Sequence, residues 1–370
     1  MPEVAAAAAA AKNSLEEAGE DSEPIVARLP VTAISDRIAV MRIQEETNYR
    51  CRDYFLDPLG HEHALGDGGD GDDMDLDDAS GPQHHHHHTQ PRPVDADCRT
   101  KMAEWCAQVI DFCKFSRETV GIGMSYLDRF MATGARRARE AMADRKDYQL
   151  AAMTTLYMAI KINEPLEMET KLLSDLSRGC YTSVEIATME IDILGALGWR
   201  VAGPTPLAFV QHFLAVGLHD TEAAANPALE ATLLDFSRFQ TELAIGIPAL
   251  LSVSPSRIAL AAILNSMEAI DDVAMNPFER ISFYRAIEAT SGIDPSAKEL
   301  LPIRSLLMDS FVRNSGVDFK QVATQLGLGA QRQRATKSCS LSGSEGSDVE
   351  VSPVCVSQTG ANGMKKQRCA

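Results

Sequence analysis

Four charged residues stand inside otherwise apolar, helix-like stretches and are the first candidates for chemistry. They are Arg99, Asp128, Lys161 and Glu190. A charged side chain in such surroundings is normally paired with an opposite charge or used by a partner, because an isolated buried charge is costly. The sequence therefore predicts that each of the four is either paired or used for binding.

The sequence carries no catalytic constellation. Gly121 and Gly123 are a fragment of a nucleotide-binding loop at best, because a third glycine and a preceding strand are missing. The Asp128-Arg129 pair lacks the surroundings of a kinase catalytic loop, and there is no DFG motif. No histidine pairs with a cysteine or serine in a nucleophile-like arrangement. We therefore expect no enzymatic activity and no cofactor.

The composition restricts the partners of the chain. The formal net charge of −17 and the pI near 5 argue against a nucleic-acid-binding surface, which needs clustered Lys and Arg. Eight cysteines without a CxxC motif fit reduced thiols in an intracellular protein and predict no zinc site. The Ala5–Ala11 run is too short to span a membrane and has no basic leader. We expect an intracellular protein that binds neither nucleic acid nor membrane.

The helix predicted over Tyr148–Ile162 organises the rest of the chain. It is apolar almost all round, and a helix without a polar face is buried by its neighbours. Asp147 is its expected N-cap and Pro165 its expected stop. Lys161 lies at its C-terminal end, where the helix dipole favours a cation. This segment therefore predicts the hub of a small helical bundle.

Helical periodicity surrounds this hub on both sides. Gly121 and Gly123 lie inside a helix capped by Ser116, which indicates close packing, since glycine disfavours helices. The segment Thr133–Lys146 is expected to be a polar connector, and Gly198 ends the last helix of this set. The other predicted helices of the set are 98–115, 168–176 and 183–197.

A second set of helices follows, and its third member is again Ala-rich and almost uniformly apolar. No segment predicts a β-strand. The fold class is therefore expected to be all-α, with two tandem five-helix units. The predicted helices of the second set are 205–216, 229–245, 255–269, 277–289 and 295–314.

The remaining segments divide the chain into domains and linkers. A helix capped by Ser35 or Asp36 is expected over 35–57. The acidic segment 58–97 cannot bury enough apolar surface to order itself, and its run His84–His88 either binds metal adventitiously or, as we favour, has no role. The predicted organisation is 1–34 disordered, 35–57 helix, 58–97 disordered linker, 98–202 first unit, 203–328 second unit and 329–370 disordered Ser-rich tail.

Five positions in these helices resemble the signature of the cyclin box in order and spacing. They are Arg99 in CRTKMAEW, Asp128 in YLDRF, Leu150 and Lys161 in YQLAAMTTLYMAIKINEP, and Glu190 in YTSVEIATMEIDILGALGW. The stretch TPLAFVQHFL resembles the opening of a second cyclin box, so the resemblance covers about residues 98–315. The segment WCAQVIDFCKFSRETV is most similar to the sequences of diatom-type cyclins. The resemblance implies tandem five-helix cyclin boxes.

The same resemblance implies a regulatory subunit that binds and activates a cyclin-dependent protein kinase. It implies a buried ion pair between Arg99 and Asp128, and a packing role for Leu150. Lys161 and Glu190 would hydrogen-bond the start of the kinase αC helix and hold it inward, so that the αC glutamate meets the β3 lysine. The remainder of the implied kinase contact consists of Met158, Ile162, Glu164, Leu194 and Trp199.

A substrate-docking patch of the family is only partly present. Two of its four positions are changed, and an ammonium in such a groove would discourage an apolar substrate motif. We therefore do not expect substrates to be recruited through it. The four corresponding positions are Cys98, Lys101, Met102 and Trp105.

The Ser-rich tail carries candidate modification sites. Ser342 and Ser347 each precede a glutamate by three residues, a spacing that acidophilic kinases favour, and Ser352 precedes a proline. Phosphates there would create a site for the arginines of a ubiquitin ligase; the alternative is a solvated spacer. The RxxL motif at Arg304–Leu307 lies inside a predicted helix, out of reach of a degradation receptor. The basic end 365–368 is a weak nuclear signal, so we expect nucleus, cytoplasm or both.

Two other functions stay open at this point. A transcription factor or adaptor can reuse a two-box fold to bind DNA or protein, but the acidic charge argues against DNA. A scaffold that binds through its acidic linker is supported by charge alone.

Overall fold

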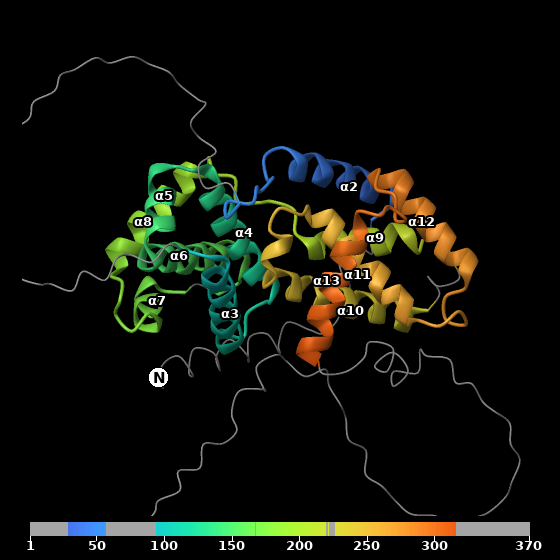
Figure 1. The fold of residues 1–370 in the computed structure, drawn as a ribbon. Coiled ribbons are helices and arrows are strands. Elements are labelled where there is room, and N and C mark those ends of the chain that lie inside the picture. The colour runs from blue at the N-terminus through green and yellow to red at the C-terminus, as the bar shows by residue number, and fades with distance from the viewer. Residues whose placement is uncertain (1–28, 57–93, 167, 220, 222–225, 316–370) are drawn as a thin grey trace, which may run out of the picture. The chain divides into compact units, whose positions relative to one another are not determined.

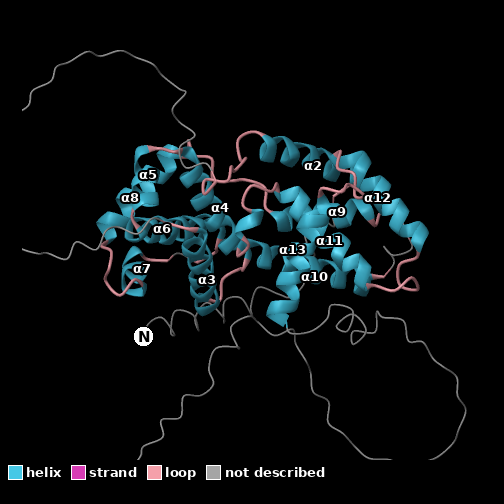
Figure 2. Cartoon of the chain, viewed as in Figure 1, coloured by secondary structure: helices cyan, strands magenta, loops and turns pink. Residues whose placement is uncertain are grey.

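The computed structural model describes residues 29–56, 94–166, 168–219, 221 and 226–315. These residues form twelve α-helices and a short 3-10 helix, and none of them forms a β-strand (Figure 2). The all-α prediction is confirmed. Residues 58–93 of the predicted linker, the candidate phosphorylation sites and the basic end lie outside the described residues. The last four residues of that linker, 94–97, are described, and α3 (Ala96–Cys113) already begins two residues before the predicted start of the first unit at residue 98. The chain divides into two compact units, which we describe separately.

Unit 2 comprises Cys51–Cys106 and Thr119–Ala202 and is built around α6 (Figure 1). From Leu150 to Ile160 every side chain of α6 is buried, as a helix without a polar face requires. Helices α5, α7 and α8 pack against one another or against α6. The predicted hub is confirmed. The helices are α3 (Ala96–Cys113, of which only the first part belongs to this unit), α4 (Glu118–Thr133), α5 (Arg136–Ala143), α6 (Arg145–Asn163), α7 (Thr170–Leu176) and α8 (Ser183–Ala196).

Two predictions about the entry into α6 are wrong. The N-cap is Asp144, whose side chain accepts from Lys146 N at 3.0 Å, rather than Asp147, which lies in the first turn, where its negative charge suits the helix dipole. The expected polar connector before it contains α5. This helix buries only small residues, Ala138 and Ala141, at 0% exposure, so it leaves little apolar periodicity in the sequence.

The glycine in α4 does allow a close approach. A Cβ placed on Gly123 would lie 3.1 Å from Leu156 Cα of α6, tighter than ordinary contacts. The predicted close packing at Gly123 is therefore confirmed, and it places α4 directly against the hub.

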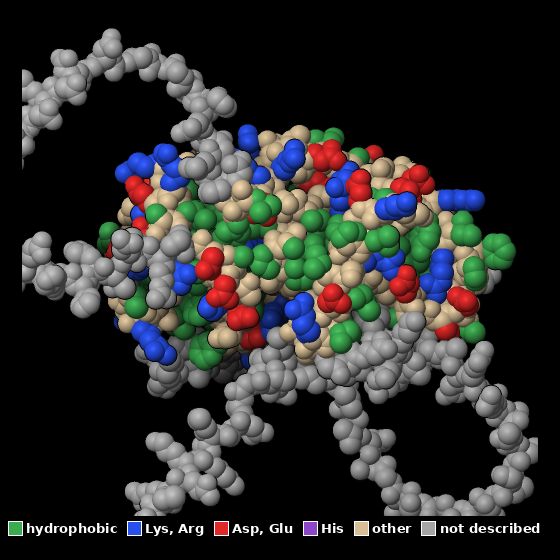
Figure 3. Space-filling view, viewed as in Figure 1, with side chains coloured by type: hydrophobic (Ala, Val, Ile, Leu, Met, Phe, Trp, Pro, Cys, Tyr) green, Lys and Arg blue, Asp and Glu red, His purple; other side chains and the backbone are tan. Residues whose placement is uncertain are grey.

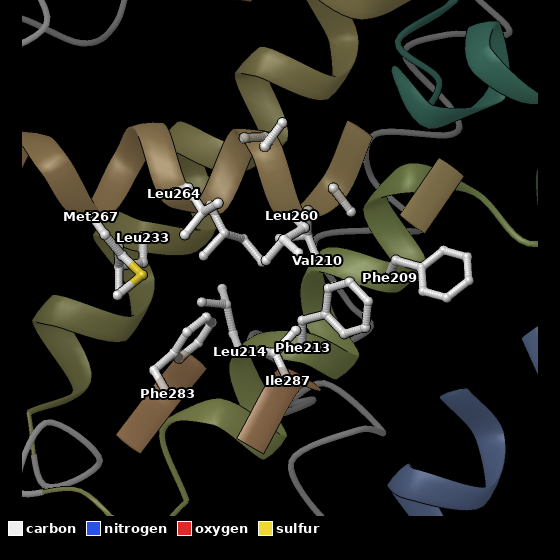
Figure 4. Close-up of a cluster of buried hydrophobic side chains, with 14 of the residues drawn as sticks. Phe209, Val210, Phe213, Leu214, Leu233, Leu260, Leu264, Met267, Phe283 and Ile287 are labelled. Carbon is white, nitrogen blue, oxygen red and sulfur yellow. The ribbon is translucent and has the colours of Figure 1, made fainter. Parts of the chain in front are cut away.

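Unit 1 comprises 1–50, 107–118 and 203–370, and its core surrounds α11. Helices α9, α10 and α13 pack against α11, and side chains from several of these helices interdigitate in one apolar cluster (Figure 4). The rings of Phe209 and Phe213 of α9 lie 5.5 Å apart between centroids and are tilted by 45°. The elements are α2 (Val31–Glu46), the end of α3, α9 (Pro206–Gly217), α10 (Pro227–Ile245), η3 (Pro248–Leu250), α11 (Pro255–Ala269), α12 (Pro277–Ser291) and α13 (Leu300–Ser315).

The N-terminal helix α2 differs from its prediction. It begins after Pro30, not at Ser35 or Asp36, and it ends at Glu46 rather than at residue 57. The apolar residues Tyr49 and Tyr54, which the prediction placed in this helix, lie in turns. The side chain of Glu45 is buried and accepts from Ser256 N at 2.9 Å and from Ser256 Oγ at 2.5 Å. Since Ser254, the N-cap of α11, makes no side-chain cap bond, Glu45 supplies that cap from α2.

The RxxL motif lies inside α13, as the sequence predicts, although α13 begins at Leu300 rather than at Pro295. Arg304 Nε donates to Asn265 Oδ1 at 2.9 Å, and the Leu307 side chain is fully buried. Both ends of the motif are therefore held inside unit 1, Arg304 by a hydrogen bond and Leu307 by burial.

His212 of α9 carries a consequence for stability at acid pH. Its Nδ1 lies 2.7 Å from Ala208 O, and its Nε2 is buried and has no hydrogen-bond partner among the described residues. Burial lowers the pKa of His212, and the positive charge of Arg37 lowers it further, against the opposing hydrogen bond to Ala208. The imidazole of His212 is therefore harder to protonate in the folded protein than in the unfolded chain, where its pKa is about 6.5.

We expect His212 to make unfolding easier as the pH falls below about 6.5, since there the unfolded state binds more protons than the folded state. The free energy of unfolding from urea titrations at pH 7.5 and 5.5 should drop more for the wild type than for His212→Leu. His219→Leu, which removes an exposed imidazole, serves as the control and should keep the wild-type drop. An equal drop in the wild type and His212→Leu would show that His212 does not contribute.

Candidate functional site

The C-terminal end of α6 and the helix α8 build the candidate site. Helix α8 starts with a capping box, in which Thr182 Oγ1 accepts from Glu185 N at 3.2 Å and Glu185 Oε2 accepts from Thr182 N at 2.8 Å. Hydrogen bonds from the Thr182 backbone and side chain lower the pKa of Glu185. Because α8 packs along α6, a residue near the C-terminal end of α6 meets one in the middle of α8.

One ion pair joins the two helices. Lys161 Nζ donates to Glu190 Oε1 at 2.7 Å, and the same Nζ lies 4.9 Å from the ring centroid of Tyr157. The side chains are 39% and 19% exposed, so the pair is open to solvent on one side. An ammonium has three N–H donors and a carboxylate accepts several hydrogen bonds. The pair therefore offers both a donor and an acceptor to another molecule.

Large apolar side chains are exposed on the same two helices and the segments that follow them. Among the described residues of unit 2, the only other large hydrophobic side chain that is exposed is Leu56. Several large exposed apolar side chains on one pair of helices are typical of an interaction site. We call the ion pair and these side chains the α6–α8 patch. Its apolar members are Ile162 (50% exposed), Leu166 (40%), Val184 (74%), Ile191 (70%) and Trp199 (74%).

The sequence selected some of these residues and missed others. Ile162 and Trp199 are exposed, and Leu194 is half-buried. Met158 is 1% exposed, so the prediction that it supplies contact surface is wrong: its side chain packs inside unit 2. Glu164 is half-buried and its Oε1 accepts from Thr119 Oγ1, which ties it to α4. The exposed Leu166, Val184 and Ile191 were not predicted as contact residues.

A second ion pair is buried at the centre of unit 2. Arg99 Nε and Nη2 donate to the two carboxylate oxygens of Asp128, each at 2.8 Å. Tyr54 Oη donates to Asp128 Oδ1 at 3.0 Å and lies 3.3 Å from Tyr148 Oη. Burial raises the pKa of Tyr54, and the nearby Asp128 charge raises it further. Burial opposes the charge on Arg99, but Asp128 outweighs it and raises the pKa of Arg99. Leu150 is also buried.

The positions of the degenerate docking patch do not form a continuous apolar surface. Lys101 Nζ donates to Asp97 Oδ2 at 2.5 Å, and both side chains are 68% exposed. Met102 is buried, and Cys98 and Trp105 are half-buried. The ammonium of Lys101 is therefore held at the surface of α3 by Asp97, one helical turn earlier.

Metal clusters and membrane-spanning helices are both absent from the described residues. These residues contain no group of three or more His, Cys, Asp or Glu side chains placed to hold a metal ion. No helix among them is both long and apolar enough to cross a bilayer.

Comparison with known proteins points to one family. Residues 74–202 match the family described as "Cyclin, N-terminal domain". The chain is 28% identical over 165 residues to G2/mitotic-specific cyclin-2 of Antirrhinum majus, covering 45% of this chain and 34% of that protein. It is 30% identical over 166 residues to G2/mitotic-specific cyclin S13-6 of Glycine max, covering 45% and 33%.

The solved structure of a viral cyclin from herpesvirus saimiri aligns with 60% of this chain and 89% of its own, at 21% identity and a TM-score of 0.47. The alignments with the two plant proteins span about a third of the length of each. The finer resemblance to diatom-type cyclins stays a prediction.

Proposed function

We propose, from the match of residues 74–202 to the cyclin N-terminal domain, that the chain is a cyclin, which binds a cyclin-dependent protein kinase and activates it. As a regulatory subunit it performs no chemistry itself. The observation that supports the proposal is the α6–α8 patch, in which a half-open ion pair and the exposed apolar side chains belong to the same two helices and the segments that follow them. Such a surface, with a polar anchor and apolar neighbours, is typical of a protein–protein contact.

The proposed contact uses both members of the ion pair. Lys161 Nζ donates to a backbone carbonyl of the kinase αC helix, and the Glu190 carboxylate accepts from a backbone N–H. Each partner stays close to the other at 2.7 Å, so neither charge is stranded when water leaves the contact. Ile162, Ile191 and Trp199 bury apolar area against the kinase, which contributes affinity.

Activation follows from binding one kinase conformation better than the other. In the active state the αC glutamate meets the β3 lysine, a pair that phosphoryl transfer requires. A cyclin surface that fits only the inward αC helix shifts the kinase toward that state by its differential affinity. Because α6 is buried from Leu150 to Ile160, the surface is held on a rigid element and need not be ordered on binding.

The alternative of a DNA-binding two-box factor has less support. On the face shown in Figure 3, the Lys and Arg side chains of the described residues are interspersed with Asp and Glu and do not gather in one basic surface. The net charge of −17 acts against association with a phosphate backbone.

We expect the recombinant chain to bind at least one member of a panel of purified cyclin-dependent kinases, and to raise that kinase's phosphorylation of histone. Calorimetry measures the dissociation constant, and radiolabelled phosphate incorporation measures the activity. Duplex DNA, followed by fluorescence anisotropy at the same salt concentration, should show no binding. Binding to DNA together with no binding to any kinase would replace the proposal by the alternative.

Two other parts of the proposal rest on the sequence alone. The tail, with Ser342, Ser347 and Ser352 as acceptors of phosphate, is proposed to recruit a ubiquitin ligase. The protein is proposed to work in the nucleus, the cytoplasm or both, where the cell-cycle kinases act.

A further inference from the structure

The turn that ends α8 has an unusual backbone. Gly198 and Trp199 are consecutive residues with positive φ, 57° and 60°. Glycine adopts this left-handed region freely, but for a bulky residue it is strained and persists only when its surroundings enforce it. Trp199 N donates to Leu194 O at 2.9 Å, and the indole side chain is 74% exposed. The turn therefore stores strain while its side chain makes little contact that could compensate for it.

Two side chains of α4 hold the residues that follow. Arg129 Nη2 donates to Arg200 O at 2.8 Å, and Tyr126 Oη donates to Val201 O at 2.5 Å. Both donors are buried, at 6% and 2% exposure, and lie one helical turn apart. The carbonyls of the two residues directly after Trp199 are thus fixed to a helix of the unit's interior.

We propose that Tyr126 and Arg129 are positioning residues, which hold this turn so that Trp199 is displayed at the α6–α8 patch. That the displayed Trp199 contacts a kinase rests on the proposed function, whereas the way Tyr126 and Arg129 hold the turn rests on their hydrogen bonds alone. Once either anchor is removed, the backbone of Trp199 can relax out of the left-handed region, and the indole samples other directions. Fixing the indole in advance reduces the entropy lost on binding, which is how pre-organisation raises affinity.

The competing explanation is that both bonds only satisfy buried polar groups. A matched control separates the two explanations. Tyr181 is also 2% exposed, lies in the same unit, and its Oη donates to a backbone carbonyl, Lys146 O, at 2.8 Å. Tyr181→Phe therefore removes the same kind of bond as Tyr126→Phe, at a place that does not contact the turn.

The first readout needs no partner. The sequence has two tryptophans, so Trp105→Phe leaves Trp199 as the only indole reporter. In that background we expect Tyr126→Phe and Arg129→Lys to lower the time-resolved fluorescence anisotropy of Trp199, with unchanged helical circular dichroism. Tyr181→Phe should leave the anisotropy as it was. Equal anisotropy in Tyr126→Phe, Arg129→Lys and the parent would overturn the inference, whether or not a kinase binds.

The second readout is affinity for a kinase that the wild type binds. Tyr126→Phe should raise the dissociation constant by about three- to tenfold, the effect of one net hydrogen bond, and Tyr181→Phe should not. Adding Tyr126→Phe to Trp199→Ala should cost nothing further, because the anchor acts through the indole. A wild-type dissociation constant for Trp199→Ala would also overturn the inference. Failure of every kinase to bind the wild type is a failure of the proposed function, and the anisotropy result then stands by itself.

Discussion

Replacing Asp128 by asparagine should lower the free energy of unfolding by about 3–5 kcal/mol, the usual effect of breaking a buried ion pair. The variant keeps the size of the side chain but leaves the guanidinium of Arg99 without a countercharge, in a site where the two side chains are only 5% and 9% exposed. Tyr54 Oη also loses its charged acceptor at 3.0 Å. The effect on stability should be among the largest of any single polar substitution in unit 2.

Urea denaturation followed by circular dichroism measures this change. Arg99→Met and Asp128→Leu should each be similarly destabilising, whereas the two combined should cost clearly less than their sum, since two apolar side chains leave no charge behind. Arg145→Ala breaks an exposed pair with Asp95, 2.9 Å apart, and should leave the midpoint almost unchanged. Additive effects of the two single variants would mean that the pair is not coupled.

Lys161→Ala and Glu190→Ala should each weaken kinase binding by about 2–5 kcal/mol, or roughly 30-fold or more, if the pair is desolvated in the complex. The same substitutions should change the free energy of unfolding by about 1 kcal/mol or less, because a half-exposed pair contributes little to stability. The two quantities therefore move by very different amounts, which separates a binding residue from a structural one.

Calorimetry with one purified kinase and urea denaturation of the isolated protein measure the two quantities. Lys101→Ala is the matched control, because Lys101 also forms an exposed ion pair, with Asp97 on α3, and should leave both quantities unchanged. The double variant Lys161→Ala/Glu190→Ala should lose histone phosphorylation. Full kinase activation by that double variant would remove the pair from the proposed contact.

Much of the fold could be predicted from apolar periodicity. The hub α6 and the helix Pro255–Ala269 have apolar side chains all round, and such helices leave a strong signal. The start of α6 could not be placed as well, because Asp144 and Asp147 are both good caps and only the tertiary path of the chain selects between them. Helix α5 gave no signal, since alanines are its buried residues.

The site was harder to predict than the fold. The charges of the α6–α8 patch could be found, because Lys161 and Glu190 stand out in apolar helices. Its apolar members could not, because Met158 and Ile191 are alike in the sequence: one faces the core at 1% exposure, the other faces solvent at 70%. That difference depends on which neighbours cover α6 and α8, and it appears only in the assembled unit.

The bond between Glu45 and the start of α11 joins residues 211 positions apart, and this separation bears on how the chain is made. Unit 2 ends at Ala202, so all its residues have been synthesised before most of unit 1 exists. Helix α2 is synthesised early, but the helices that cover it, α9, α11 and α12, are synthesised only after unit 2. We therefore expect unit 2 to fold first on the ribosome and unit 1 to close around α2 later, as its slower, long-range contacts require. Proteolysis of stalled nascent chains would reveal that order.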